Sequence, residues 1–432
     1  MQNHPHQIDA PANSLLPLLS VNFVGTLGFS IVIPFLVFLV TKWGGNSLIF
    51  GLLGATYSAF QFIGAPILGR WSDLYGRRKI LLLSQLGTLV SWIIFLAAFF
   101  LPVTILNEID SPFLGKFTLT VPLLVIFFAR AADGLTGGNI SVANAYLADI
   151  SDEKNRSENF GKMALSGNLG YVLGPALAGL LGATVWGEVL PVIAALLISL
   201  AATLIIWFWL QESRTAPLNT DPEACKLRKI FGQEHKECYQ LEGSQKIPVR
   251  IIFSLKDIPV LMVINFLVML GFSFFYVIFP VNAALGLGWP IFQTGAFLAV
   301  LSLLMVIVQG PVLARASKIW SDRALAVFGS LVLAGGFGLF IATDELTIYA
   351  GAVFVALGNG LMWPSILALI SKRAGAQYQG TVQGFVGSSG AIASVIGLSS
   401  AGLFYNFLGS IEFLLAGLMI FCVSILMATI KA

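Results

Sequence analysis

The chain alternates between long apolar stretches and short polar segments along its whole length. A helix needs about 20 mostly apolar residues to cross the hydrocarbon core of a bilayer. Twelve stretches meet this requirement, namely residues 15–40, 48–69, 79–102, 119–147, 160–185, 189–210, 258–282, 291–314, 324–342, 347–370, 380–405 and 411–430. Barrel strands of about ten residues alternate in polarity, whereas runs such as 121–129 are continuously apolar. The pattern predicts an all-α membrane protein with twelve transmembrane helices.

Composition narrows the class of protein further. Of the 432 residues, 57% are hydrophobic and only 10% are charged, and the mean hydropathy is +0.88. Soluble proteins carry about 25% charged residues, so a lipid bilayer is the expected surrounding. The net charge of +3 is too small and too dispersed to indicate a nucleic-acid partner. The first basic residue is Lys42, so the run 15–40 lacks the basic start of a signal peptide and is interpreted as the first span.

Basic residues predict the orientation of the chain. Nearly all of the 24 Lys and Arg residues fall in alternate loops on one side, whereas only Lys42 and Lys116 fall on the other. By the positive-inside rule, both termini and the long polar loop 211–257 should be cytoplasmic. Cys225, His235 and Cys238 in that loop fit no standard zinc spacing. We therefore expect no metal and no cofactor.

The loop 211–257 divides the chain into two sets of six predicted helices. Residues 64–73, which read Gly-Ala-Pro-Ile-Leu-Gly-Arg-Trp-Ser-Asp, align with residues 309–318, which read Gln-Gly-Pro-Val-Leu-Ala-Arg-Ala-Ser-Lys. We expect an N-terminal bundle of residues 1–210, a linker at 211–257 and a C-terminal bundle of residues 258–432, related by pseudo-symmetry. Parallel repeats of this kind are typical of one large transporter class, with the binding site between the halves near mid-membrane.

Charged residues inside a span are costly and need a reason. Arg130 and Asp133 lie one turn apart in the fourth predicted span, on a face with small and polar residues that should border a cavity. In one interpretation the two form a local ion pair that only neutralises their charges. In the other, Arg130 attracts anionic groups or Asp133 takes a proton. No predicted span contains a histidine, so Asp133 is the only obvious deep protonatable group.

Five segments carry short motifs, namely Gly-Arg-Trp-Ser-Asp-Leu-Tyr-Gly-Arg-Arg-Lys at 69–79, Arg-Ala-Ala-Asp-Gly-Leu-Thr-Gly-Gly-Asn at 130–139, Ala-Tyr-Leu-Ala-Asp-Ile at 145–150, Gly-Tyr-Val-Leu-Gly-Pro-Ala-Leu-Ala-Gly at 170–179 and Gly-Leu-Met-Trp-Pro-Ser at 360–365. These motifs resemble those of the major facilitator superfamily, and in part its tetracycline-exporter branch of drug/proton antiporters. The resemblance covers all twelve spans and implies the superfamily fold, with two six-helix bundles. It also implies that helices 1, 4, 7 and 10 line the cavity.

This implication adds substrate-binding candidates to Arg130 and Asp133. Asn22, Asn265 and Asn359 lie singly in apolar spans, and Trp363 lies one turn beyond Asn359. Hydrogen bonds between helices are the simpler explanation for each asparagine taken singly, and packing would explain Trp363 equally well.

The resemblance further implies gating residues. Asp73, Arg77 and Asp149 would form a cytoplasmic latch between the halves that favours the outward-facing state. Gly69 and Gly76 permit a close approach and a tight turn, and Arg78 belongs to the same basic group. Gly174 and Pro175 belong to a stripe of small residues in the fifth span, which would pack closely and seal the path against ion leak.

Two positions differ from the tetracycline exporters, which carry acidic residues where this chain has Asn22 and Ser91. We predict a secondary active transporter that works by alternating access and couples efflux of a small amphipathic or organic compound to protons. The alternative is an importer or uniporter of an organic anion or a metal chelate such as a siderophore. We expect no enzyme activity, a monomer, and a location in the bacterial inner membrane.

Overall fold

The computed structural model describes residues 15–137, 139–151, 156–213 and 254–430. Cys225, His235 and Cys238 therefore lie outside the described residues, and so does the side chain of Asp73. The N-terminal half contains α1 (Leu15–Ser30), α2 (Ile33–Lys42), α3 (Ser47–Tyr75), α4 (Arg77–Ala97), η1 (Ala98–Phe100), β1 (Ile105–Ser111), β2 (Gly115–Thr120), α5 (Val121–Thr136), α6 (Asn139–Asp149), α7 (Arg156–Gly182) and α8 (Val189–Phe208). The C-terminal half contains α11 (Ile258–Val281), η3 (Asn282–Gly286), α12 (Ile291–Ile307), η4 (Val308–Val312), α13 (Leu313–Ala316), α14 (Asp322–Leu339), α15 (Glu345–Leu408), η5 (Gly409–Glu412) and α16 (Phe413–Thr429).

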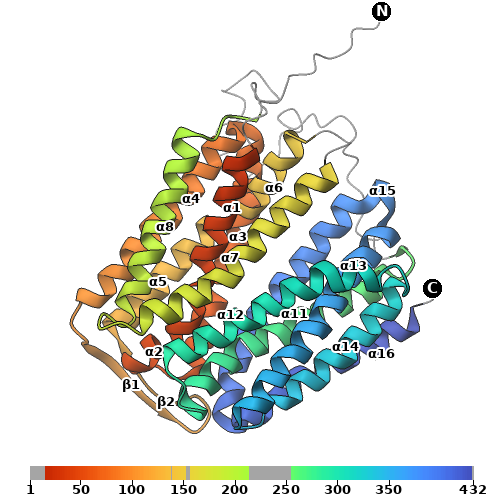
Figure 1. Ribbon diagram of the computed structural model, residues 1–432. Coiled ribbons are helices and arrows are strands. Elements are labelled where there is room, and N and C mark those ends of the chain that lie inside the picture. Colours follow the sequence, from red (N-terminus) through yellow and green to blue (C-terminus); the bar gives the residue numbers. More distant parts are fainter. Residues whose placement is uncertain (1–14, 138, 152–155, 214–253, 431–432) are drawn as a thin grey trace, which may run out of the picture.

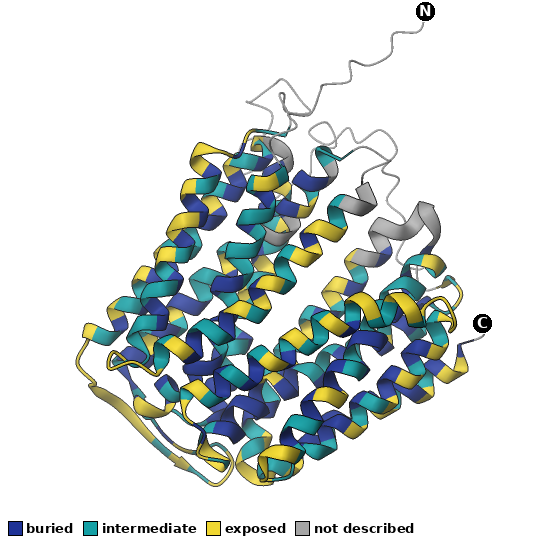
Figure 2. Ribbon diagram, viewed as in Figure 1, coloured by how far each residue is buried: buried dark blue, intermediate teal, exposed yellow. Residues whose placement is uncertain are grey.

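The helices form two bundles, one from α1–α8 and one from α11–α16 (Figure 1). The bundles meet at the end that carries the β1–β2 hairpin, which we call the hairpin end. They diverge toward the opposite end (Figure 1). We call this the linker end, because the described chain stops there at residue 213 and resumes at residue 254. Large apolar side chains on the outer helix faces are exposed, including Phe128 at 64% and Phe208 at 68%. Exposed residues follow these outer faces in Figure 2, as expected for a surface that contacts lipid.

The described residues contain ten helical stretches that are long and apolar enough to cross a membrane. The fourth predicted span is present as α5 and α6, each shorter than a full span, with a break after Thr136. The last two predicted spans fall in one continuous stretch, Gly384–Thr429, because η5 joins the end of α15 directly to α16. The 64 residues of α15 in turn cover both the tenth and the eleventh predicted spans. The all-α membrane fold is confirmed, whereas the count of twelve stays a prediction.

The structure adds one element that the apolar pattern did not predict, the antiparallel hairpin β1–β2. Its turn is closed by Gly115, whose φ is +75°, and by the Ser111 hydroxyl, which accepts hydrogen bonds from the backbone N–H groups of Phe113 and Leu114. The Leu114 carbonyl accepts hydrogen bonds from Asn46 and, across the halves, from Asn406. The hairpin therefore helps to join the two bundles at this end.

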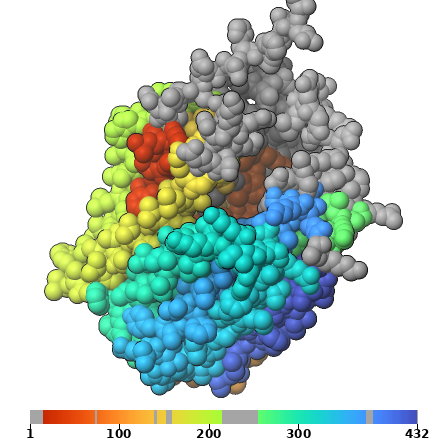
Figure 3. Space-filling model, turned by 45° about the vertical axis from the view of Figure 1, so that its right-hand side comes forward, coloured from red at the N-terminus to blue at the C-terminus, as the bar shows by residue number. Residues whose placement is uncertain are grey.

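Two seams join the halves at the hairpin end, and each depends on glycine. In the α7–α12 seam, a Cβ atom at Gly295 would collide with the Pro175 carbonyl oxygen, and Gly179 lies against the backbone of Phe292. The contact between α7 (yellow) and α12 (cyan) is visible in Figure 3. Only residues without a side chain allow two helix backbones to approach this closely.

The α3–α15 seam repeats this arrangement with the halves exchanged. A Cβ atom at Gly51 would collide with the Leu398 carbonyl oxygen, and one at Gly402 would collide with the Ser47 carbonyl oxygen. The Ser47 hydroxyl also donates a hydrogen bond to the Gly402 carbonyl oxygen at 2.8 Å. In both seams a glycine and the carbonyl four residues before it meet a glycine of the other half. The repeated pattern is what pseudo-symmetry between the bundles requires.

Candidate functional site

The charged pair predicted in the fourth span lies in the last turns of α5, just before the break that separates α5 from α6. The Arg130 Nη1 atom is 3.5 Å from Asp133 Oδ2, and the two side chains are 8% and 13% exposed. The Arg130 guanidinium also lies over the Tyr57 ring of α3, with Cζ 4.9 Å from the ring centroid. The Thr88 side chain of α4 lies beside the Asp133 carboxylate, and both line one cavity. Three helices therefore hold one ion pair in a largely dry position.

The pair lies between two cavities. One, of about 150 Å³, is enclosed by helices of the N-terminal half and is lined by Asp133 together with Asn22 and Gln85. The other, of about 250 Å³, lies between the halves and is lined by Arg130 from one half and Tyr276 from the other. Phe29, Tyr57 and Tyr171 line both cavities and form the wall between them. The two members of one ion pair thus border different cavities.

Arg130 still has an unused hydrogen-bond donor. Among the described residues, its buried Nε atom has no hydrogen-bond partner, although Nη1 faces Asp133. A guanidinium has five N–H donors in a planar fork that suits carboxylate and phosphate groups. The arrangement therefore leaves Arg130 able to bind an anionic group at the cavity between the halves.

The sequence analysis missed the aromatic residues of this site. Tyr57 lies one helical turn before Gln61, whose Nε2 atom donates to the Tyr57 hydroxyl at 3.2 Å and to the Gly137 carbonyl oxygen at 3.1 Å. The second bond satisfies a carbonyl beside the helix break after α5. The lone polar Gln61 in an apolar span was the available signal, because Tyr57 shares its helix face.

Asn22 and Asn265, both predicted to bind substrate, are engaged in bonds between helices. Asn22 Nδ2 on α1 donates to the Met163 carbonyl oxygen at 2.9 Å and to Ser166 Oγ at 2.8 Å, both on α7. Asn265 on α11 is 1% exposed and is bonded to α15. Asn22 also lines the cavity of the N-terminal half, whereas Asn265 lines neither of the two cavities. These contacts favour helix positioning as the role of both residues.

Asn359 and Trp363 lie on α15, away from both cavities. Asn359 Nδ2 is 3.7 Å from the Met305 sulfur of α12, and Trp363 is half-buried against the apolar core. Neither residue lines the two cavities described above.

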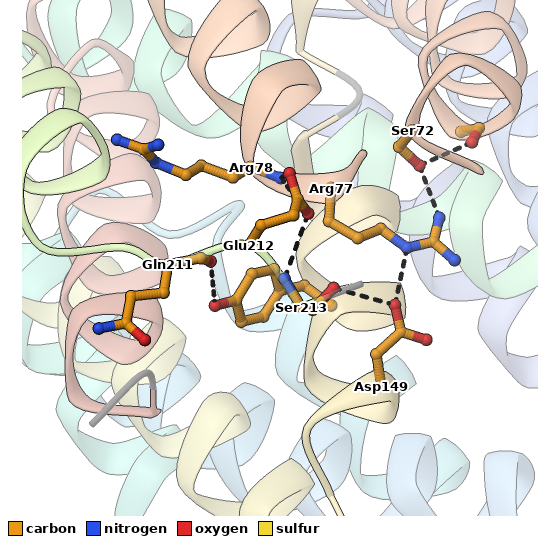
Figure 4. Close-up of polar contacts among 9 residues, drawn as sticks. Ser72, Arg77, Arg78, Asp149, Gln211, Glu212 and Ser213 are labelled. Carbon is orange, nitrogen blue, oxygen red and sulfur yellow. Dashed lines mark hydrogen bonds and ion pairs between the residues drawn. The ribbon is translucent and has the colours of Figure 1, made fainter. Parts of the chain in front are cut away.

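Arg77 and Arg78 of the 69–79 segment lie in one polar cluster with Asp149 and with residues at the beginning of the linker (Figure 4). Arg77 Nε lies 3.0 Å from Asp149 Oδ2, and Arg77 Nη1 donates to Ser72 Oγ at 2.7 Å. Arg77 begins α4 and Asp149 ends α6, so this ion pair joins two helices of the same half.

Residues that the sequence analysis did not single out complete this cluster. Ser213 Oγ donates to Asp149 Oδ2 at 3.1 Å, and the Glu212 carboxylate accepts the backbone N–H of Arg78 at the start of α4. Gly76 has φ +101°, and a Cβ atom there would meet the Glu212 carboxylate. A carboxylate at a helix N-terminus is favoured by the helix dipole. The cluster ties the beginning of the linker to α4 and α6.

Of the remaining gating candidates, Gly174 and Pro175 lie against neighbouring helices, whereas the space beside the Gly69 Cα atom is open. A Cβ atom at Gly174 would collide with the Ser30 side chain of α1, and Pro175 contributes its carbonyl oxygen to the α7–α12 seam. A Cβ atom at Gly69 would meet nothing within 4 Å.

Together, the apolar outer surface, the two bundles and the charged pair beside a cavity between them define a multi-pass integral membrane transporter. The chain belongs to the Major Facilitator Superfamily, whose family model matches residues 18–398.

Similar proteins include drug-resistance proteins of bacteria. The chain is 26% identical over 394 residues to the class B tetracycline resistance protein of Escherichia coli, covering 90% of this chain and 87% of that protein. It is 24% identical over 405 residues to multidrug resistance protein 2 of Bacillus subtilis, covering 93% and 90%.

Solved structures share the fold. The human organic anion transporter MFSD10 (TETRAN) superposes with a TM-score of 0.66 at 20% identity, covering 96% of this chain and 99% of that chain. A D-xylose-proton symporter superposes with a TM-score of 0.73 at 14% identity, covering 97% and 98%.

Proposed function

We propose that this transporter exports a small amphipathic or organic compound in exchange for protons, by alternating access. The observation that carries the proposal is the Arg130–Asp133 pair, whose members border two different cavities. While Asp133 is ionised, the ion pair holds Arg130 in place, with its Nε donor available to substrate at the cavity between the halves. A proton on Asp133 removes the charge that holds Arg130 and so weakens substrate binding, and bound substrate in turn disfavours the proton, as exchange requires. Proton binding and substrate binding are thereby linked through one residue pair.

The cavity between the halves supports a small substrate with an aromatic or apolar body. Phe272 and Tyr276 line it together with the hydroxyl groups of Ser58, Ser273 and Ser394. Its volume of about 250 Å³ lies just below the range of about 300–1,000 Å³ that is typical of ligand pockets. The names of the bacterial relatives, tetracycline and multidrug resistance proteins, support export as the direction of transport.

We assign the described conformation to the inward-facing state. The assignment rests on the positive-inside rule, by which the linker end and both termini face the cytoplasm. The glycine seams then close the external side, and Gly174 and Pro175 act in that closure. On this interpretation the Arg77–Asp149 cluster, with Asp73, Gly69, Gly76 and Arg78, controls the cytoplasmic side. The bacterial relatives support a location in the bacterial inner membrane, and we propose a monomer as the working unit.

A second candidate function is import or uniport of an organic anion or a metal chelate such as a siderophore. The free Nε donor of Arg130 beside the cavity between the halves favours an anionic cargo. Asn22 supplies no carboxylate to a proton route. A structural neighbour is named as an organic anion transporter.

A flux assay in proteoliposomes with an imposed pH gradient separates these candidates. The panel contains amphipathic cations, neutral drugs, aromatic carboxylates and ferric chelates. Antiport predicts that substrate moves up its gradient against proton entry, and a uniporter predicts flux that ignores the pH gradient. Asp133→Asn should abolish gradient-driven accumulation and leave counterflow exchange measurable. Asp110→Asn, at an exposed carboxylate of the hairpin, is the matched control and should transport normally.

A further inference from the structure

A second buried carboxylate, Glu412, lies at the hairpin end of the C-terminal half. It ends the short helix η5 between α15 and α16, and its side chain is 0% exposed. Within the described part of the chain, neither of its carboxylate oxygens has a hydrogen-bond partner. Glu412 occupies the N-cap position of α16, yet its side chain makes no capping hydrogen bond. The sequence analysis, which took Asp133 as the only obvious deep protonatable group, missed this residue.

Among the described elements, those packed most closely against η5 are η3, α15 and α16. The basic residues of these elements, Lys372 and Arg373 of α15, are paired with Asp322 and Asp257 instead of Glu412. Helix η3 has no titratable residue, and the titratable residue of α16 is Cys422. The titratable group that faces Glu412 is the phenol of Tyr405 on α15. That hydroxyl lies 3.1 Å from Asn282 Oδ1, to which it donates its hydrogen bond. A buried carboxylate without a counter-charge or a donor is stable only when it carries a proton.

The same turn of α15 connects Glu412 to the joint between the halves. Asn406, which follows Tyr405, accepts a hydrogen bond from Ser47 Oγ at 2.7 Å. Its Nδ2 atom donates to the Leu114 carbonyl oxygen of the hairpin at 3.3 Å. Gly402, one turn earlier, contacts the Ser47 backbone in the α3–α15 seam. Movement of this turn therefore changes both the surroundings of Glu412 and the contact between the halves.

We propose that Glu412 is a proton-binding site that controls closure at the hairpin end. The carboxyl group keeps its proton while the seam is closed, as in this structure. When the halves separate at that end, the group meets water and releases the proton to the solvent, and reclosure requires it to bind a proton again. The proton is transferred between water and one carboxylate oxygen, and no other bond changes. This proposal rests on the alternating-access function but does not require proton coupling at Asp133.

Distance measurement between spin labels tests the proposal without any transported substrate. Labels on Val185 and Leu346, which are 100% and 83% exposed, report separation of the halves at the hairpin end in a protein whose native cysteines are replaced. In the wild type, the ratio of separated to closed molecules should rise with pH, by at most about tenfold per pH unit for a single proton. Glu412→Gln keeps the size and mimics the protonated group, so it should stay closed and lose the pH response. Glu412→Asp should retain the response.

Glu345→Gln is the matched control, because Glu345 is an exposed carboxylate near the same end that accepts a hydrogen bond from Gln293. It should behave as the wild type does. A pH response of Glu412→Gln equal to that of the wild type would overturn the proposal. A wild-type distance distribution that ignores pH would overturn it too, even if the Gln variant failed to fold. Since no flux is measured, failure of the export proposal leaves this result interpretable.

Discussion

Asn22 and Asn265 occupy equivalent places in the two halves and make the same pair of hydrogen bonds. Asn22 donates to the Met163 carbonyl oxygen and to the hydroxyl of Ser166, three residues later. Asn265 donates to the Val386 carbonyl oxygen at 2.9 Å and to the hydroxyl of Ser389 at 3.1 Å, again three residues later.

The equivalence extends along the helix pairs. A serine eight residues after each asparagine, Ser30 or Ser273, packs against a glycine of the partner helix, Gly174 or Gly397. These partner helices, α7 and α15, also form the seams between the halves. The asparagines therefore fix helices that the transport movement must carry as rigid units.

The first prediction concerns these asparagines. In Asn22→Asp, the new carboxylate would face the Met163 carbonyl oxygen, an acceptor that repels it unless the acid is protonated. The variant should be less heat-stable than the wild type at neutral pH and should recover as the pH falls, because protonation restores a donor. Asn265→Asp should behave alike. Alanine variants should lose only about 0.6 kcal/mol each, the average for hydrogen bonds between membrane helices, at any pH. Thermal unfolding in detergent across pH measures both, and a pH-independent loss in the Asp variants would contradict the prediction.

The same position bears on drug recognition. The tetracycline exporters carry an acidic residue where this chain has Asn22, so we expect a strain that expresses the unmodified protein to gain no tetracycline resistance. Asn22→Asp alone should raise a flux that depends on acidic pH. The minimal inhibitory concentration for tetracycline, measured beside a vector control, tests this directly. Strong resistance from the unmodified protein would show that this single position does not decide recognition.

The buried ion pair between Arg130 and Asp133 should give non-additive losses of stability when its two members are replaced singly and together. Removing one partner of a buried ion pair leaves an uncompensated charge and costs about 3–5 kcal/mol. Arg130→Met and Asp133→Asn should each be strongly destabilising. Arg130→Met should be the worse, because Arg130 keeps its contact with the Tyr57 ring in Asp133→Asn, whereas Asp133 loses its counter-charge in Arg130→Met. The double variant should unfold at a higher temperature than Arg130→Met alone. Additive losses in this double-mutant cycle would mean that the pair is not coupled.

The glycine seams predict a change in conformational populations. Gly402→Ala places a methyl group against the Ser47 carbonyl oxygen, and Gly295→Ala places one against Pro175. Each variant should increase the hairpin-end separation between labels on Val185 and Leu346. Loss of about 1.4 kcal/mol from the closed state changes the population ratio about tenfold. Gly335→Ala is the matched control, since a Cβ atom there meets nothing within 4 Å. An unchanged distance in both seam variants would exclude the seams as determinants of closure.

The linker-end cluster predicts a defect in transport without a defect in insertion. Asp149→Asn removes the charge that holds Arg77 and leaves every basic residue that sets the topology in place. Asp73→Asn removes the other acidic charge of the motif and likewise leaves the basic residues in place. Both variants should insert normally, bind substrate and show a lower net transport rate. Asp73→Asn, which removes the charge proposed to bind the opposing half, should also increase the fraction of inward-facing molecules. Labels on Ser151 and Lys372 should report a longer average distance at the linker end. Normal transport with an unchanged distance would leave the motif as a topology signal only.

The membrane fold and the charged pair could be predicted from the sequence because both depend on the free energy of placing a short stretch of residues in the bilayer. The hydropathy of about 20 consecutive residues decides whether a helix enters a bilayer, and a charge in such a stretch is conspicuous whatever its neighbours are. Arg130 and Asp133 were found in this way, and so were the basic loops between the spans. The repeat was found instead by aligning residues 64–73 with residues 309–318. The hairpin 105–120 was not, because its short alternating strands lie between two spans that dominate the pattern.

Only the tertiary structure decided which of these residues meet. Asn22 appears in the sequence as a candidate for substrate contact, yet its donor is used by α7, which begins more than a hundred residues later. Glu412 appears as an ordinary acid at the start of the last predicted span, and its burial depends on the packing of η3, α15 and α16. Whether a polar side chain on one helix reaches a partner on another depends on how closely the two helix backbones approach. That distance depends on small residues such as glycine on both helices. The sequence alone therefore determined what the membrane accepts, while packing between the helices determined which polar groups are bonded and which are left to bind a proton or a substrate.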